Sequence, residues 1–282
     1  MSLRSQFPVE VVGVVTRRQS KFNADFASLD PLANVNGIPC FFASPNQDDE
    51  MAQWIARLKP DVIYCFGWSY LLPKSILNIP RLGVIGYHPA ELPKNRGRHP
   101  LIWALALGLD HTASTFFFMD EGADSGDILH QEIVPISKRD YARDLYDRMI
   151  QIAMKQIPIF TQQLIDGTYR RIPQDHSRAN YWRKRSSKDG EIDWRMSAGT
   201  IYNLVRAMSR PYPGAHIRTE SGDVRIWRCE VIAETTPLEY KNMEPGKVLR
   251  VSHEGIDVKC GEGIIRLTEH EFSVLPKEGE YL

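Results

Sequence analysis

The stretch at 83–97 constrains the fold most, because an apolar strand there runs straight into a histidine and a proline-rich loop. Two β-branched residues close the predicted buried strand, and His88-Pro89 follows after two more residues. Ligands of open α/β sheets bind at the carboxyl ends of strands, so the His88 imidazole is predicted to lie at a binding edge. Leu92-Pro93 and Arg96-Gly97 predict a loop rather than a helix, because proline lacks a backbone donor and glycine permits unusual dihedrals.

An acidic turn further along the chain is predicted to complete the site. After a predicted helix at 101–107 and a predicted strand at 113–119, the turn Asp120–Asp127 places two glycines around Asp124. A histidine and an aspartate, each at a strand end with glycine nearby, have the rigid support, open approach and mutual reach of a general acid/base pair. The carboxylates of Asp120 and Asp127 are predicted to cap the turn.

The N-terminal half of the chain alternates strand and helix patterns. Strands are predicted at 9–16, 38–42 and 61–66, with a polar, irregular stretch at 17–36. Between the last two strands, one face of a predicted helix carries Met51, Trp54, Ile55 and Leu58 at i, i+3, i+4 and i+7. This order predicts an α/β fold with a parallel sheet and right-handed crossovers.

The C-terminal half reads differently. A long helix is predicted at 139–167, with Pro158 kinking it, and the polar, basic run at 169–190 is predicted to be a linker. A short helix at 198–209 precedes four short strands, at 224–231, 246–251, 255–260 and 263–268. Closely spaced short strands predict a small β-barrel.

Composition narrows the class of protein. The chain has 282 residues with 35 basic and 35 acidic side chains, which argues against a protein wholly devoted to nucleic acid and leaves a local basic patch open. The four cysteines are scattered without a C-x-x-C pair, which predicts reduced thiols and no metal site. No apolar run approaches the ~20 residues of a membrane span, and no signal-peptide pattern is present, so a soluble cytoplasmic protein with no membrane partner is expected.

Across these motifs the chain resembles the folate-dependent formyltransferases, which include methionyl-tRNA formyltransferase and the N-formyltransferases of nucleotide-linked amino sugars. The resemblance rests on His-Pro-x-x-Leu-Pro-x-x-Arg-Gly from His88, on Pro100 with Trp103-Ala104, and on Asp-x-Gly-Asp-Ile from Asp124. The run Arg-Ala…Pro-Tyr-Pro-Gly-Ala at 206–215 is similar to the entry of the family's C-terminal oligonucleotide-binding (OB)-like domain.

The resemblance implies two domains. A Rossmann-like formyltransferase domain is expected at 1–185 and an OB-like β-barrel at 186–282. The family usually begins with a further strand and helix before the strand that 9–16 resembles. We therefore expect the first strand to be missing, with Met1-Ser-Leu3 as vector residues or a truncated start, and sheet edges that need covering.

The resemblance also implies a catalytic centre in which His88 donates or shuttles a proton, while Asp124 orients His88 and receives the amine proton, directly or through water. A purely structural His-Asp pair is the alternative. The family places an asparagine two residues before this histidine, where its amide binds the developing oxyanion, but this chain has Gly86 there. Either a backbone N–H, Asn95 or a water replaces that donor, or the chain is a weak or inactive relative. Restoring asparagine at 86 is expected to raise the rate or leave it unchanged, and a sharp drop would mean that the glycine makes room for another group.

Binding residues follow from the same resemblance. The formyl donor is expected to be 10-formyltetrahydrofolate, held by Gly67, Trp68, Tyr70, Leu72, Ala123 and Asp124. Simple packing of Trp68 and Tyr70 over the sheet is the open alternative. The acceptor side is expected to comprise Glu91, Leu92, Pro93, Arg96 and Gly97. Glu91 is either a partner for an amine or a solvated charge, and Arg96 either anchors the loop or meets a phosphate.

The expected function is transfer of a formyl group to the amine of a nucleotide-linked amino sugar. Overall length, balanced charge and the loop pattern favour this acceptor. The first alternative is methionyl-tRNA formyltransferase acting on initiator tRNA, which the basic run at 170–188 favours. The second is an inactive folate-binding relative. A homodimer is left open.

Overall fold

The computed structural model describes residues 7–19, 26–219 and 222–282. They form two compact units. The first unit comprises Met1–Gly97, Ala113–Ile133 and Met149–Tyr181, and the second comprises Arg98–Thr112, Val134–Arg148 and Trp182–Leu282. The predicted division at residue 185 remains a prediction, and the expectation for Met1-Ser-Leu3 lies outside the described residues.

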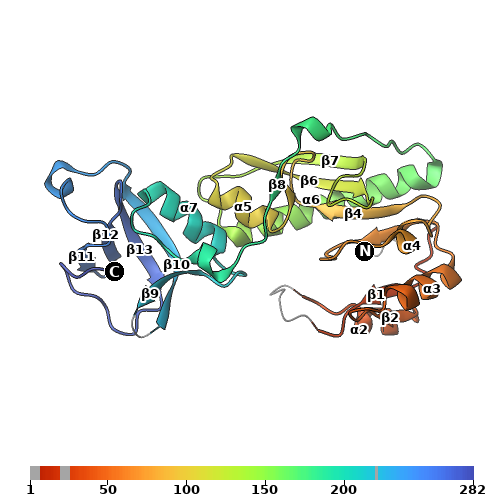
Figure 1. Cartoon of the computed structure of the whole chain (residues 1–282), viewed down its shortest axis with the longest axis horizontal. Coiled ribbons are helices and arrows are strands. Elements are labelled where there is room, and N and C mark those ends of the chain that lie inside the picture. Colours follow the sequence, from red (N-terminus) through yellow and green to blue (C-terminus); the bar gives the residue numbers. More distant parts are fainter. Residues whose placement is uncertain (1–6, 20–25, 220–221) are drawn as a thin grey trace. The chain divides into compact units, whose positions relative to one another are not determined.

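The first unit is built on a four-stranded sheet in the order β3-β4-β6-β7, with a separate parallel pair β1-β2 (Figure 1). Its strands are β1 (Val14–Thr16), β2 (Cys40–Phe42), β3 (Ile63–Cys65), β4 (Val84–His88), β5 (Arg96–Gly97), β6 (His111–Phe118), β7 (Ile128–Pro135) and β8 (Tyr181–Trp182). Its helices are α2 (Asp30–Val35), α3 (Asp48–Leu58), α4 (Lys74–Leu77), α6 (Ala142–Asp166) and the 3₁₀ turn η1 (His176–Arg178). The ends of β6, β7, α6 and β8 extend into the second unit.

Alternation along β4 gives this sheet two covered faces. Val84 packs in a cluster with Met51 and Ile55 of α3 and Ile76 of α4. The next residue, Ile85, packs instead with Phe160 and Leu164 of α6. Because successive strand residues point to opposite faces, α3 and α4 cover one side and α6 covers the other. This three-layer arrangement confirms the Rossmann-like prediction, and His88 is the residue at the carboxyl end of the inner strand β4.

Strand direction was only partly predicted. β3 and β4 are parallel, as expected, but β4 and β6 are antiparallel, with His88 opposite Thr115. The expectation of a parallel sheet is therefore wrong at β6. Apolar content marks a buried strand without fixing its direction, which depends on how the chain returns to the sheet.

The first predicted strand is shorter than expected. Only Val14–Thr16 of the stretch at 9–16 is a strand, since its partner β2 offers three residues for pairing. The side chains of Trp54 and Leu58 lie against the backbone at Gly13, where an added Cβ would come within 2.7 Å and 2.5 Å of them. The stretch at 17–36, predicted to be irregular, contains α2, whose signal is proline at the first helical turn beside Asp30.

The second unit is an antiparallel β domain with two helices. Its five strands run in the order β11-β12-β13-β10-β9. They are β9 (Ala215–Thr219), β10 (Gly222–Ala233), β11 (Val248–Ser252), β12 (Gly255–Lys259) and β13 (Ile264–His270), with helices α5 (Pro100–Ala106) and α7 (Ala198–Met208) and 3₁₀ turns η2 (Ser187–Gly190) and η3 (Leu238–Tyr240). The prediction of an α/β sheet plus a small C-terminal β domain is confirmed, although β9 was not foreseen.

Helix α7 shows why its sequence folds locally as it does. The Ser197 side chain accepts a hydrogen bond from the Thr200 backbone N–H, which caps the helix. The buried face carries Ile201, Leu204 and Val205. Within the described residues, no helix is both long enough and apolar enough to cross a membrane.

Candidate functional site

His88 is the last residue of β4 and is 4% exposed. Its Nε2 lies 2.7 Å from the backbone oxygen of Asn95. A carbonyl oxygen only accepts, so Nε2 carries a hydrogen and donates it to Asn95. The other ring nitrogen, Nδ1, is therefore the atom at which a neutral His88 can take up a proton.

Asp124 lies opposite that free nitrogen. Its Oδ2 is 3.5 Å from His88 Nδ1 and also accepts a hydrogen bond of 2.8 Å from the Gly97 backbone N–H. Asp124 has φ 55°, the left-handed region that non-glycine residues seldom occupy, and such strain concentrates at functional sites. The structure thus brings together the two residues expected to form the acid/base pair.

The acidic turn holds Asp124 in place through its own local contacts. Asp120 Oδ1 accepts hydrogen bonds from the Gly122 backbone N–H at 3.0 Å and from Ser125 Oγ at 2.6 Å, which confirms its predicted capping role. At Gly126, an added Cβ would lie 1.8 Å from the Phe118 carbonyl oxygen. Only glycine lets the turn approach β6 this closely.

Gly86 has no room for a side chain. An added Cβ would lie 2.9 Å from the Phe117 ring and 2.9 Å from Met119 Cγ. Phe117 is 3% exposed and packs with Leu92 and Ile128. The space in which the family's asparagine was expected is therefore filled by an aromatic ring from β6.

Asn95, whose backbone oxygen contacts His88, carries a side-chain amide with a defined orientation. Its backbone N–H donates to Asn180 Oδ1 at 2.8 Å, which fixes the orientation of the Asn180 carboxamide. Asn180 Nδ2 then donates to Asn95 Oδ1 at 3.2 Å. This reciprocal pair leaves Asn95 Nδ2 with two hydrogens and no acceptor among the described residues. The network thus defines which end of the Asn95 amide is available to a ligand.

The residues expected to hold folate lie in the loop after β3 and in the acidic turn. Trp68 and Tyr70 are in edge-on contact with ring centroids 6.5 Å apart, and Leu72 is buried in the cluster around Val84. Trp68 Nε1 is buried without a hydrogen-bond partner. Gly67 adopts φ 69°, and Ala123 precedes Asp124 directly in the turn.

Sequence reasoning missed Arg17 at this loop. Its guanidinium lies 4.5 Å from the Tyr70 ring centroid and 5.5 Å from that of Trp68, and Nη1 donates to Tyr70 Oη at 3.3 Å. The only signal in the sequence is its place directly after the strand β1. The loop thus combines aromatic surface with a cation.

The residues expected on the acceptor side separate into two groups. Leu92, joined to Pro93 by a cis peptide bond, is 2% exposed, and Glu91 lies nearer the surface with Lys94 Nζ at 3.5 Å. Arg96 is 2% exposed, and all three of its nitrogens have protein partners. This geometry supports loop anchoring by Arg96, the first of its two alternatives.

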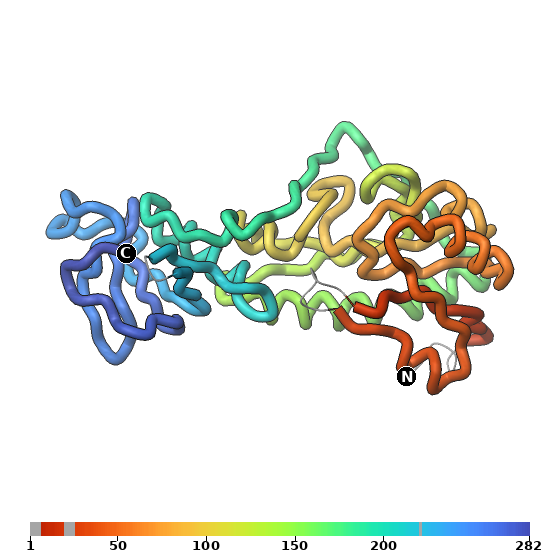
Figure 2. Tube along the Cα trace, turned by 60° about the horizontal axis from the view of Figure 1, so that its bottom comes forward, coloured from red at the N-terminus to blue at the C-terminus, as the bar shows by residue number. Residues whose placement is uncertain are grey.

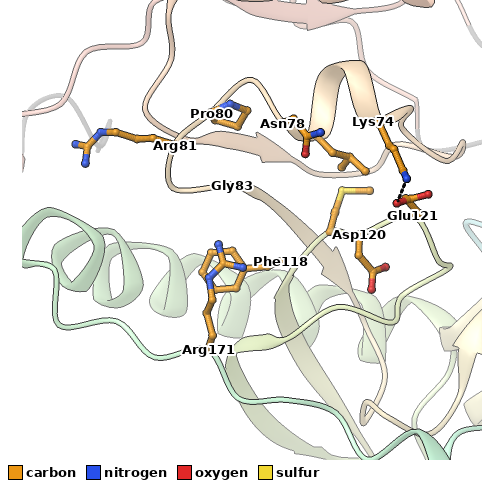
Figure 3. Close-up of a pocket in the computed structure, with 11 residues that line it drawn as sticks. Lys74, Asn78, Pro80, Arg81, Gly83, Phe118, Asp120, Glu121 and Arg171 are labelled. Atoms are coloured by element: carbon orange, nitrogen blue, oxygen red, sulfur yellow. Dashed lines mark ion pairs between the residues drawn. The ribbon is translucent and has the colours of Figure 1, made fainter.

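The cavity in Figure 3, of about 580 Å³, lies at the other end of β4. It is lined by Gly83, Phe118, Asp120 and Arg171, among others, and neither His88 nor Asp124 contributes to it. Arg171 stacks on Phe118 at 3.6 Å, and Lys74 pairs with Glu121 at 2.8 Å. No group of three or more His, Cys, Asp or Glu side chains in the described part of the chain is arranged to hold a metal ion.

Solved structures share this fold at low sequence identity. HypX from Aquifex aeolicus in complex with tetrahydrofolic acid is 18% identical, with a TM-score of 0.64, over 91% of this chain and 43% of HypX. The N-formyltransferase from Helicobacter canadensis, in complex with folinic acid and dTDP-3-aminofucose, is 17% identical, with a TM-score of 0.66, over 89% of this chain and 87% of that one. Methionyl-tRNA formyltransferase from Clostridium thermocellum is 20% identical, with a TM-score of 0.59, over 90% of this chain and all of that one.

These similarities establish the fold, and the chain spans less than half the length of HypX. The family assignment comes from the sequence profiles. The profile for formyl transferase matches residues 2–160, and that for the formyl transferase C-terminal domain matches residues 184–274. The first match alone covers more than half of the chain, and it contains both His88 and Asp124. The chain therefore belongs to the formyl transferase family.

Proposed function

We propose that the protein transfers a formyl group from 10-formyltetrahydrofolate to the amine of a nucleotide-linked amino sugar. One observation carries the proposal: His88 Nδ1 and Asp124 Oδ2 face each other at 3.5 Å within the domain that defines the family. Acyl transfer to an amine needs a group that takes a proton from the attacking nitrogen, and this pair meets that need.

The residues present fit a folate donor. Trp68 Nε1 is a buried donor without a protein partner, and such a group is costly unless a ligand or water satisfies it. It lies in the loop expected to bind the pterin, where the Trp68 ring contacts that of Tyr70 and packs against the cluster that contains Leu72. When bound, the folate supplies the formyl group on its nitrogen.

The chain's own residues would then divide the work. Asp124 orients His88 and stabilises the imidazolium that forms when Nδ1 takes up the amine proton. His88 would then deliver that proton to the folate nitrogen as the bond between this nitrogen and the formyl carbon breaks. The Asn95 backbone oxygen holds Nε2 and keeps the ring in the tautomer that leaves Nδ1 free. Asn95 Nδ2 donates to the formyl oxygen as negative charge develops there, in place of the missing side chain at Gly86.

The amino-sugar acceptor has two supports. The net charge of zero gives no overall attraction to a polyanion such as tRNA. The Helicobacter canadensis enzyme, which holds a dTDP-linked amino sugar, shares the fold along most of both chains.

Initiator tRNA is the second candidate, favoured by the basic run at 170–188. Several of these cations already have local partners. Arg171 stacks on Phe118 and donates to the Leu82 carbonyl, and Arg183 forms an ion pair with Asp189. This reduces the positive charge available to phosphates and ranks the tRNA second.

The deciding experiment offers the purified protein 10-formyltetrahydrofolate with one of three partners: dTDP-linked 3-amino or 4-amino sugars, methionyl initiator tRNA, or no acceptor. We expect a formylated sugar, detected by mass spectrometry, with stoichiometric loss of the folate formyl group. Formylated methionyl-tRNA would replace the acceptor assignment. Binding of folate without transfer to either acceptor would identify an inactive relative and refute the proposal.

Replacing His88 by Asn tests the proton-transfer assignment. General acid/base catalysis contributes about 10²–10⁴ in rate, so kcat should fall by that order while the dissociation constant for folate stays near the parent value. Steady-state kinetics and isothermal titration measure the two quantities. Turnover close to that of the parent protein would disprove the role of His88.

A further inference from the structure

The chain after α6 does more than connect two domains. Residues 172–181, here called the return segment, were predicted to be part of a linker. Ile172 exchanges two backbone hydrogen bonds with Ile128, at 2.8 Å and 2.9 Å, just after the acidic turn. The Arg96 N–H donates to the Asn180 carbonyl at 3.0 Å, so β8 lies against the loop that carries Asn95 (Figures 1 and 2).

Gln174 ties this segment to the acidic turn. It is 6% exposed, and its Nε2 donates to the backbone oxygens of Asp124 at 3.0 Å and Gly126 at 2.6 Å. Its Oε1 accepts from Arg96 Nη2 at 2.7 Å and Nε at 3.2 Å. One buried carboxamide therefore links the turn of Asp124 to the loop of Arg96, and all its hydrogen bonds are internal to the protein.

Arg96 also contacts two other residues of the return segment. Its Nη1 donates to Tyr181 Oη at 2.9 Å, and its Nη2 lies 3.1 Å from His176 Nδ1. A buried guanidinium with a partner at every nitrogen is held in one orientation, because losing any of these hydrogen bonds would leave a buried donor without a partner. Arg96 thus fixes the loop that begins at the cis peptide bond of Pro93 and includes Asn95.

Asn180 sets the direction of the Asn95 amide. It accepts from the Asn95 backbone N–H and donates to the Asn95 side-chain oxygen, so both of its own ends have defined roles. Exchanging the two ends of the Asn95 carboxamide would place two N–H groups against each other. Asn180 therefore determines that the nitrogen, and not the oxygen, of Asn95 is offered to a ligand.

We propose that the return segment positions the catalytic groups, with Asn180 acting through Asn95 and Gln174 acting through the turn of Asp124. This inference rests on the proposed formyl transfer. A positioning residue changes the rate of the chemical step without touching the substrate, since a donor must lie within hydrogen-bond distance of the oxygen that becomes negative.

The isosteric variant Asn180→Asp separates positioning from folding. Aspartate still accepts from the Asn95 N–H, but its second oxygen also demands a donor, so the Asn95 carboxamide turns and presents its oxygen to the site. We expect kcat to fall toward the loss given by Asn95→Ala, about 10²–10³ for one oxyanion donor, with an unchanged KM for the folate donor. Arg178→Ala is the matched control, because Arg178 is exposed on the same segment, and it should keep the parent kcat.

A double-mutant cycle makes the test decisive. If Asn180 acts through Asn95, then Asn180→Asp should cause no further loss of kcat in an Asn95→Ala background. Independent, additive losses would overturn the proposal, and so would parent kinetics in Asn180→Asp alone. If the parent protein transfers the formyl group but the two losses of kcat are additive, the proposed function stands and only the positioning role is refuted. If the parent protein does not transfer a formyl group, both the proposed function and this inference are refuted.

Gln174→Glu completes the experiment at the acidic turn. Glutamate keeps the acceptor for Arg96 but places a negative oxygen against the carbonyls of Asp124 and Gly126. We expect a lower kcat together with a shifted pH profile, because the displaced Asp124 no longer stabilises the His88 imidazolium equally. A lower melting temperature with unchanged kcat and pH profile would mean that Gln174 is structural only.

Discussion

At the scale of single residues, the site is defined by which donor or acceptor atoms of His88 and Asn95 already have a hydrogen-bond partner in the protein. His88 has its Nε2 engaged by a carbonyl and its Nδ1 directed at a carboxylate. Asn95 has its carboxamide oxygen engaged and its nitrogen available. These assignments follow from the donor or acceptor character of each atom, and they identify the atoms on which the proposed function depends.

Gly86 is the residue at which the structure revises the sequence expectation. Introducing Asn was expected to raise the rate or leave it unchanged, but an added Cβ meets Phe117 and Met119 at 2.9 Å. We now expect Gly86→Asn to destabilise the protein by about 1–3 kcal/mol, as overpacking of a core does. Chemical denaturation measures this change.

The matching control combines this change with a smaller neighbour. In Gly86→Asn with Phe117→Leu, the contact with the Phe117 ring is relieved and that with Met119 remains, so the double variant should be more stable than the sum of the two single losses implies. A Gly86→Asn protein as stable as the parent would show that the Phe117 ring moves aside freely, contrary to its 3% exposure.

At the scale of secondary-structure elements, a partly buried ion pair holds the turn between β7 and α6. Arg148 donates to both oxygens of Asp140, at 2.6 Å and 3.0 Å, and the Ser137 backbone N–H donates to Asp140 at 2.7 Å. These hydrogen bonds, chiefly those from Arg148, hold the pKa of the Asp140 carboxyl below its ordinary value.

The lowered pKa of Asp140 predicts a pH dependence. A carboxyl with a depressed folded-state pKa contributes stability above its unfolded pKa, near 4, and loses that contribution as pH falls through the folded value. Asp140→Asn should therefore be less stable than the parent at pH 7, with a gap that narrows below pH ~4. Melting curves from pH 7 to pH 3 measure it, and a gap independent of pH would contradict the assignment.

Among the elements, the sequence pattern predicts a helix with an apolar face but does not predict the burial of a polar segment. Helix α3, with its apolar face of Met51, Trp54 and Ile55, was predicted because a 3.6-residue repeat is local information. The return segment was predicted to be a linker, since polar residues carry no signal of burial until their partners are known. Gln174 is buried only because Arg96 and the acidic turn, far away in sequence, supply its hydrogen bonds.

At the scale of the whole molecule, the four cysteines lie in both units, and their burial predicts how readily each thiol reacts. Burial raises the pKa of the Cys65 and Cys260 thiols to about 12 and that of Cys229 well above its ordinary value. Cys40 is half-buried, and all four are free thiols. Because the thiolate is the reactive form, these cysteines should react slowly in the folded protein at pH 8.

Thiol titration tests this expectation. Ellman's reagent at pH 8 should modify at most Cys40 quickly in the native protein, and all four cysteines after unfolding in guanidinium chloride. Rapid native labelling of Cys229 or Cys260 would mean that the β-sheet of the second unit opens readily. Peptide mapping by mass spectrometry identifies the modified positions.

The sequence by itself determined the family, the two kinds of fold in one chain and the pairing of His88 with Asp124, because spaced motifs and strand ends are written locally. Tertiary structure alone decided the direction of β6, the filling of the space at Gly86 by Phe117, and the contacts of the return segment with the acidic turn and the loop of Asn95. Each of these depends on which distant groups meet, and a hydrogen bond or a steric clash between residues tens of positions apart leaves no mark on the residues between them.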